Sequence, residues 1–183
     1  SYPLSGIKNV RLIVTDTKGC RDTVYKDITI LDKPLLTLGF TDTLICVNDY
    51  LMLQASGNGN FSWSPPVNII NANTATPIVS PAATTTYFVD LDDNGCRNRD
   101  SVKVRVVSFV SLQTMNDTII CKGDTIRLSV ISDGLQYAWT PAVQIIDPLV
   151  QNPFVFTNSL TDYEVTAIIG GCSATDKIRV TPI

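Results

Sequence analysis

Histidine is absent from this chain of 183 residues, which removes the commonest general base and the commonest metal ligand. The cysteines form no CxxC pair, so zinc and thioredoxin-type sites are excluded by spacing. The sequence also lacks a glycine-rich phosphate loop between a strand and a helix. Carboxylates remain for glycosidase-like acid–base chemistry, but they fall mainly in turns and at strand starts, where they are expected anyway. We therefore expect a chain without enzymatic activity and without a cofactor.

Positive charge and long apolar runs are scarce as well. The 14 lysines and arginines are scattered, and with 17 acidic residues the net charge is −3, so no basic face is available for nucleic acid. No stretch approaches the roughly 18 continuous apolar residues of a membrane-spanning helix, so we expect no direct membrane insertion. Apolar residues still make up 44% of the chain, which predicts ordered domains.

What the sequence does contain is an internal repeat. Three stretches end in Gly-Cys, at Cys20, Cys96 and Cys172. The region of Cys46 matches that of Cys121 at an offset of 75 positions, and a one-residue insertion then makes the offset 76. Self-similarity of this kind predicts a tandem array. The matched pairs include Cys46/Cys121, Asp49/Asp124, Leu53/Leu128, Trp63/Trp139, Pro65/Pro141, Tyr87/Tyr163, Val89/Val165, Gly95/Gly171 and Cys96/Cys172.

The repeat divides most of the chain into two complete modules of about 75 residues, 34–108 and 109–183. Residues 1–33 align only with the last third of a repeat, so we interpret them as the C-terminal remnant of a preceding module. The chain does not begin with Met. We expect it to be a fragment of a longer protein.

Alternating patterns predict β-strands within each module. Polar and apolar residues alternate over Ser101–Val107 and Lys177–Val180, and also over Thr125–Val130 and Tyr87–Leu91. Turns rich in Gly, Asn and Asp separate these runs, and no window has a convincing helical period. About six or seven short strands per module favour an all-β fold of tandem, small immunoglobulin-like β-sandwiches.

The aromatic residues suit the cores of such sandwiches. Trp63 and Trp139 each lie between two cysteines, the order found in immunoglobulin-like domains. Recurrence at equivalent positions favours packing over ligand binding. We therefore expect Trp63 and Trp139, with Tyr87 and Tyr163, to lie in the cores.

The motifs as a set resemble a known family. Ile120–Leu128 (ICKGDTIRL), Tyr137–Pro141 (YAWTP), Asp162–Val165 and the Gly-Gly-Cys that ends at Cys172 resemble the PKD and PKD-like repeats of large surface proteins of Bacteroidetes. Val10–Asp16 with the following Gly-Cys resembles the end of a PKD module. The resemblance implies a secreted or cell-surface protein, often an adhesin exported by type IX secretion, and some relatives are filaments of gliding motility. No export-signal domain is recognisable in the sequence.

Two disulfide arrangements are open. Cys46–Cys96 with Cys121–Cys172 would close loops of about 50 residues, worth roughly 4 kcal/mol each. In an immunoglobulin-like sandwich, however, the first turn and the last hairpin lie at opposite ends, whereas bridged Cα atoms lie within about 7 Å. The alternative is an inter-module Cys46–Cys172 bridge. Cys20 would in either case pair outside the fragment, and in the second arrangement Cys96 and Cys121 would do so as well.

A recurring Asp, then Ser or Thr, then apolar motif resembles an O-glycosylation sequon of exported proteins in the same bacterial group. A glycan there would add bulk and solubility; alternatively, the Asp simply ends a turn where a strand starts. The candidate acceptors are Thr23, Thr43, Ser101, Thr118 and Thr125.

Oxygen ligands for Ca²⁺ are grouped at one hairpin, Asp90, Asp92 and Asp93. The equivalent hairpin near the C-terminus has Thr166 and Ile168 instead, so a solvated turn is the favoured interpretation.

Two functional hypotheses follow. The first is a non-catalytic spacer or stalk of a long extracellular adhesin, whose partners are its neighbouring modules. The second is a ligand-binding module, with loops Ser56–Asn60 and Asn68–Thr76 recognising a surface glycan, a protein or an outer-membrane partner.

Overall fold

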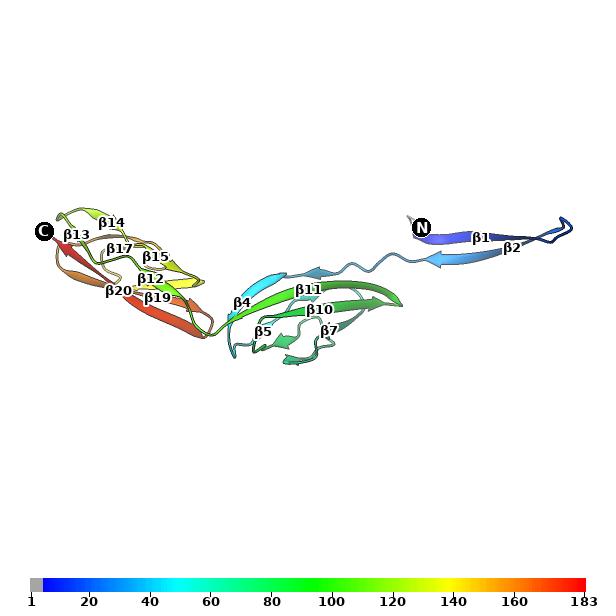
Figure 1. The fold of residues 1–183 in the computed structure, drawn as a ribbon, viewed down its shortest axis with the longest axis horizontal. Coiled ribbons are helices and arrows are strands. Elements are labelled where there is room, and N and C mark those ends of the chain that lie inside the picture. The colour runs from blue at the N-terminus through cyan, green and yellow to red at the C-terminus, as the bar shows by residue number, and fades with distance from the viewer. Residues whose placement is uncertain (1–4) are drawn as a thin grey trace.

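The computed structural model describes residues 5–183, and these residues form strands, turns and loops without any helix. The N-terminal hairpin and two β-sandwiches follow one another along the chain (Figure 1). Within the described part, no helix is long and apolar enough to cross a membrane. The all-β prediction is confirmed.

The first sandwich packs a four-stranded sheet against shorter strands. In this sheet β4 runs parallel to β11, while the β11–β10 and β10–β7 pairs are antiparallel. The order β4-β11-β10-β7 joins Asp42–Cys46, Cys96–Val107, Thr85–Asp93 and Asn60–Ser64. Opposite it, β5 (Leu51–Met52), β9 (Ile78–Val79) and β8 (Ile69–Ile70) form a three-stranded sheet, and β3 (Thr37–Leu38) pairs with β6 (Ala55–Ser56).

The second sandwich repeats this topology strand by strand. Its four-stranded sheet has the order β13-β20-β19-β16, with β13 parallel to β20. These strands are Thr118–Ile120, Cys172–Pro182, Thr161–Ile169 and Gln136–Thr140. The facing strands are β14 (Thr125–Arg127), β18 (Phe154–Phe156) and β17 (Ile145–Ile146), with β12 (Leu112–Thr114) paired to β15 (Val130–Ser132).

Each sandwich has its own core, built around the predicted aromatic residues. Trp63 and Tyr87 lie in the first core, and Trp139 and Tyr163 at equivalent places in the second. All four are at most 3% exposed. Each indole N–H donates to a backbone carbonyl, that of Thr74 or Val150, so the polar edge of the ring is satisfied inside the core.

One predicted strand is divided in two. Thr125–Val130 alternates as a single run, but β14 ends at Arg127 and β15 begins at Val130. The chain changes pairing partner here, from β18 to β12. Leu128, fully buried, lies at the step between the two. Alternation therefore predicted the inward-facing residues correctly and the continuity of the strand wrongly.

The N-terminal hairpin has no sandwich around it among the described residues. Its strands β1 (Gly6–Thr15) and β2 (Arg21–Ile30) pair along their full length. When Cys20 is matched to Cys96, the cross-strand registers place Leu12 where β10 has Val89. Val89 is fully buried, whereas Leu12 is 62% exposed. The N-terminal hairpin thus has the apolar pattern of the last hairpin of a sandwich, but its apolar face is exposed.

Candidate functional site

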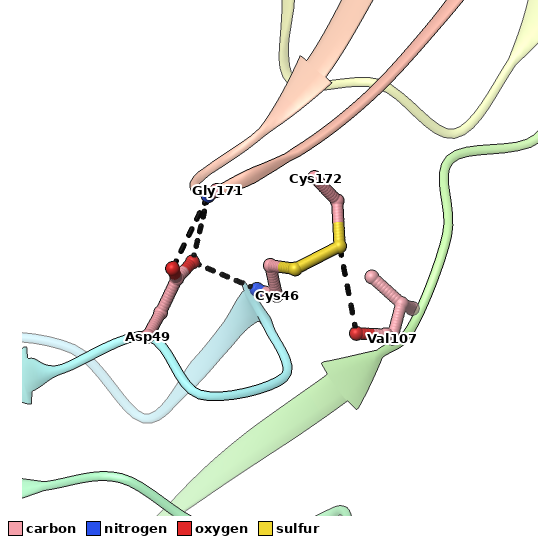
Figure 2. Close-up of a disulfide and its surroundings, with 5 residues drawn as sticks. All are labelled: Cys46, Asp49, Val107, Gly171 and Cys172. Atoms are coloured by element: carbon pink, nitrogen blue, oxygen red, sulfur yellow. Dashed lines mark hydrogen bonds between the residues drawn. A yellow bond between two sulfur atoms is a disulfide. The ribbon is translucent and has the colours of Figure 1, made fainter.

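The junction between the two sandwiches is held by a disulfide between Cys46 and Cys172 (Figure 2). Cys46 ends β4 of the first sandwich, and Cys172 begins β20 of the second. Their Cα atoms are 5.4 Å apart although 126 positions separate them in sequence, a distance typical of disulfides. The inter-module alternative is therefore the arrangement that the structure adopts.

The intra-module pairings Cys46–Cys96 and Cys121–Cys172 are wrong, for a geometric reason. Cys96 begins the 12-residue strand β11, whereas Cys46 lies beside Val107 at its other end. At about 3.3 Å per residue the two ends are roughly 36 Å apart. Cys121 and Cys172 likewise lie at opposite ends of a long strand. Cys172 begins β20, whereas Ile120, the residue before Cys121, pairs with Pro182 at the other end of β20. Cys20, Cys96 and Cys121 are free thiols.

Asp49 joins both sides of the junction through its carboxylate. One oxygen accepts the backbone N–H of Cys46 at 3.0 Å. The backbone N–H of Gly171, at the tip of the β19–β20 hairpin, donates to both oxygens at 3.2 and 3.1 Å (Figure 2). Hydrogen bonds to an ionised acceptor are stronger than those between neutral groups. Asp49 therefore fixes the hairpin of one sandwich against the turn of the other.

The hairpin tip has to be glycine for this approach. A Cβ atom at Gly170 would overlap the Asp49 carboxylate, and one at Gly171 would lie 2.8 Å from it. Gly170 also has a φ of 52°, in the left-handed region. Ordinary Cβ contacts do not come this close, so any larger residue would push the hairpin away from Asp49.

Apolar side chains surround the disulfide. Cys46 and Cys172 are 6% and 8% exposed, and they cluster with Val110, Ala167 and Ile169. Leu44, Val47 and Val107 of the first sandwich pack against this cluster. The backbone N–H of Val47 donates to the carbonyl of Val107 at 2.8 Å, which ties the turn to the last strand before the linker. The junction is thus a small core of its own.

Two carboxylates of the acidic hairpin form salt bridges with arginine side chains. Asp92 contacts Arg97 at 2.8 Å and Asp90 contacts Arg99 at 3.2 Å. The hydrogen bond from Arg97 lowers the pKa of Asp92, and the hydrogen bond from the backbone N–H of Gly95 lowers it further. Asp93 accepts from the side chain of Asn94. Among residues 5–183, no group of three or more acidic or cysteine side chains could hold a metal ion, so the arrangement does not favour the calcium site.

The proposed glycan acceptors are accessible to different degrees. Thr23 and Thr125 are exposed, whereas Thr43, Ser101 and Thr118 are half-buried. Asp42 begins β4, as the strand-start interpretation expects, but Asp100 and Ser101 lie inside β11. The Asp100 carboxylate accepts the backbone N–H of Ser101. Glycosylation of these residues stays a prediction.

A shallow hollow lies beside one of the candidate binding loops. Tyr50, Asn68, Ile70 and Ser80 are among the residues that line its volume of about 310 Å³. The Tyr50 ring is 76% exposed. An exposed aromatic next to an amide is an arrangement suited to a ligand, and no sequence pattern distinguished Tyr50. Its equivalent in the second repeat is Thr125, so this hollow is particular to the first sandwich.

Comparisons with known proteins found similarity only among solved structures. No protein family and no curated protein matches the sequence. Among solved structures, a chimeric titin Z1Z2 tandem is 13% identical, with a TM-score of 0.37 over 84% of this chain and 99% of that one. The fibronectin(III)-like modules of Clostridium thermocellum CbhA are 8% identical, with a TM-score of 0.47 over 81% and 94%. Extracellular domains 3–5 of Drosophila OTK are 8% identical, with a TM-score of 0.40 over 94% and 69%. The strand order and the separate cores, rather than these similarities, define the chain as tandem immunoglobulin-like β-sandwiches.

Proposed function

We propose that this chain is part of a non-catalytic extracellular stalk of a cell-surface adhesin of the PKD-like class, in which the modules act as mechanical spacers. The observation that carries the proposal is the Cys46–Cys172 disulfide between the sandwiches. A disulfide also fits an oxidising compartment outside the cytosol. Residues 34–108 and 109–183 are the two complete modules of this stalk, and its partners are its neighbouring modules and the surface to which it adheres.

The disulfide changes the path of tension through the chain. When the ends are pulled apart, tension passes from Cys46 directly to Cys172, and the backbone between them lies in a closed covalent loop. Tension cannot stretch out the backbone of either sandwich completely, because most of both sandwiches lies inside the covalent loop. The chain-entropy model gives the bridge about 5 kcal/mol for a loop of 126 residues. These properties suit a stalk that must transmit force without unravelling.

The N-terminal hairpin supports an array longer than two modules. Leu12, Val14 and Val24 are each more than half exposed on paired strands. In β10 and β19 the corresponding faces are covered by the rest of a sandwich. We infer that residues 1–33 are the last part of a preceding module, whose other strands cover this face.

Single-molecule force spectroscopy tests the proposal. Pulled from its two ends, the oxidised protein should extend far less than the reduced one. Reduction releases a loop of 126 residues, which adds about 430 Å of contour length at roughly 3.4 Å per residue. A Cys46→Ser and Cys172→Ser double variant should show the long contour without reductant. Equal contour lengths in the oxidised and reduced states would contradict the mechanical role.

Labelling of intact cells of the source organism tests the location. An antibody against the two sandwiches should bind unpermeabilised cells, and external protease should remove the signal. Labelling that appears only after permeabilisation would overturn the surface assignment.

A second candidate function is ligand binding at the hollow beside Tyr50. The exposed Tyr50 ring and the Asn68 amide line one side of the first sandwich, which is the observation that favours it. A glycan array compared between the wild type and Tyr50→Ala would test this. Binding that disappears in the variant supports the site, and a consistent absence of binding leaves the spacer function alone.

A further inference from the structure

The free Cys121 lies in a turn built like the one that holds Cys46. The backbone N–H of Asp124 donates to the Cys121 carbonyl at 3.1 Å, as that of Asp49 does to the Cys46 carbonyl at 3.1 Å. The backbone N–H of Lys122 donates to the Ile183 carbonyl, as that of Val47 does to the Val107 carbonyl. The third residue of each turn has positive φ, 69° at Asn48 and 87° at Gly123.

The apolar surroundings are also repeated at this end, but here they are open. Leu44 and Val107 pack in the occupied junction. Ile119 and Ile183 hold the equivalent positions beside Cys121, and they are 65% and 74% exposed. Cys121 is exposed too, whereas Cys46 is buried. The cysteine, the aspartate and two apolar residues of the first sandwich's side of the junction thus have counterparts on the second, whereas Lys122 takes the place of Val47. Within residues 5–183 no hairpin covers this second turn.

We propose that the turn Cys121–Asp124 is a second docking site and that its occupant is the Gly-Cys hairpin of another copy of the 109–183 module, joined after Ile183 through Ser108. The inference rests on the proposed stalk function and extends it to a rule for assembly. The carboxylate of Asp124 would accept the hairpin N–H that Gly171 provides at the first junction. Cys121 would then form the disulfide that Cys46 forms there.

The occupant is identified by what the first junction contains. The docked hairpin carries Gly170 and Gly171, which leave room for the carboxylate, and Ile169, which enters the junction core. The corresponding positions of the first sandwich are Asn94, Gly95 and Asp93. A charged residue in place of Ile169 would be poorly accommodated beside Ile119 and Ile183. The site therefore fits a module like the second sandwich rather than one like the first.

The covalent step needs an oxidant, and a small-molecule disulfide such as glutathione disulfide suffices. One thiolate attacks the glutathione disulfide and releases one glutathione. The second thiolate attacks the resulting mixed disulfide and releases the other glutathione. Two thiols lose two protons and two electrons, and one glutathione disulfide becomes two glutathione molecules.

The test is a fusion in which a second copy of residues 108–183 follows Ile183 of the full chain. After oxidation in a glutathione buffer, peptide mass spectrometry without reduction should find Cys121 linked to the appended counterpart of Cys172. The Cys46–Cys172 peptide in the same sample reports that folding and oxidation have succeeded. Free Cys121 beside an intact Cys46–Cys172 bridge would overturn the inference while leaving the first junction, and the force measurement on it, untouched.

A second readout separates docking from chance oxidation. Before oxidant is added, alkylation of Cys121 should be slower in the fusion than in the 183-residue protein, because the docked hairpin covers it. Asp124→Ala in the fusion should restore fast alkylation. Asp100→Ala, which removes an exposed carboxylate bonded to its own neighbour, should leave alkylation slow. Equal alkylation rates in the fusion and the shorter protein would contradict docking.

Discussion

The carboxylate of Asp49 accepts the backbone N–H of Gly171, which lies 122 positions later in the sequence and in the other sandwich. The same carboxylate accepts the N–H of Cys46, so the disulfide and its polar contact share one turn. Cys46 and Asp49 also recur together as Cys121 and Asp124. The junction is therefore a short structural unit in which a Cys-x-x-Asp turn binds a Gly-Cys hairpin.

Asp49→Ala should weaken the junction without unfolding either sandwich. The loss of hydrogen bonds to a partly exposed carboxylate costs about 1–2 kcal/mol. We expect the Cys46–Cys172 bridge to be reduced at roughly tenfold lower concentrations of dithiothreitol, since about 1.4 kcal/mol corresponds to tenfold in an equilibrium constant.

Asp124→Ala is the matched control for that experiment. Asp124 occupies the same place in a turn of the same form, but no hairpin donates to it among the described residues. Asp124→Ala should leave unchanged the midpoint concentration of dithiothreitol at which the Cys46–Cys172 bridge is reduced. A midpoint that shifts equally in both variants would show that the effect does not depend on the contact between Asp49 and Gly171.

Gly170→Asn should disrupt docking while preserving the hairpin. Asn94 adopts a φ of 51° in the β10–β11 turn, close to the 52° of Gly170, so Asn tolerates this backbone conformation. Its side chain, however, would overlap Asp49. We expect a loss of about 1–3 kcal/mol in the stability of the disulfide, typical of overpacking, measured against glutathione.

A double variant identifies the source of that loss. In an Asp49→Ala background the overlap disappears, so the additional cost of Gly170→Asn should fall nearly to zero. Costs that simply add would place the strain inside the hairpin and not at the contact with Asp49.

The cores were predictable from sequence because the signals that form them are local. Trp63, Tyr87 and their counterparts recur within strongly alternating strands, and alternation alone places them inside. The disulfide was narrowed to two arrangements, one of them the observed Cys46–Cys172 bridge, because cysteine spacing is compatible with closure within a module and between modules. The length of β11 decides between the two pairings, because it keeps Cys46 and Cys96 at opposite ends of the sandwich. The recurrence of Asp49 as Asp124 was a visible signal for the junction, but its role depends on a hairpin that is distant in sequence.

Strongly alkaline pH should destabilise both sandwiches through their buried tyrosines. Burial raises the pKa of both Tyr87 and Tyr163. Because the folded pKa lies above the unfolded value of about 10, the neutral form is favoured in the fold. This contribution is complete below pH 10 and is lost as the pH rises through the folded pKa.

Urea denaturation at pH 8 and at pH 10.5 measures the effect, with free thiols blocked. The double variant Tyr87→Phe, Tyr163→Phe should lose less stability between these two values than the wild type. At pH 8 it should be neutral or slightly stabilising, since neither buried hydroxyl has a hydrogen-bond partner within residues 5–183. A variant with the same pH dependence as the wild type would assign the alkaline loss to other groups.

Leucine-to-alanine substitutions at two hairpins test whether the N-terminal hairpin lacks its cover in this chain. Leu91, in β10, is fully buried, and Leu91→Ala should cost about 2–5 kcal/mol in the free energy of unfolding. Leu12, in β1, is 62% exposed, and Leu12→Ala should change it by less than about 0.5 kcal/mol. If a preceding module of the same kind were added before residue 1, Leu12 would enter its core. Leu12→Ala would then cost as much as Leu91→Ala, and a cost that stays near zero in the extended chain would refute the assignment of residues 1–33 to such a module.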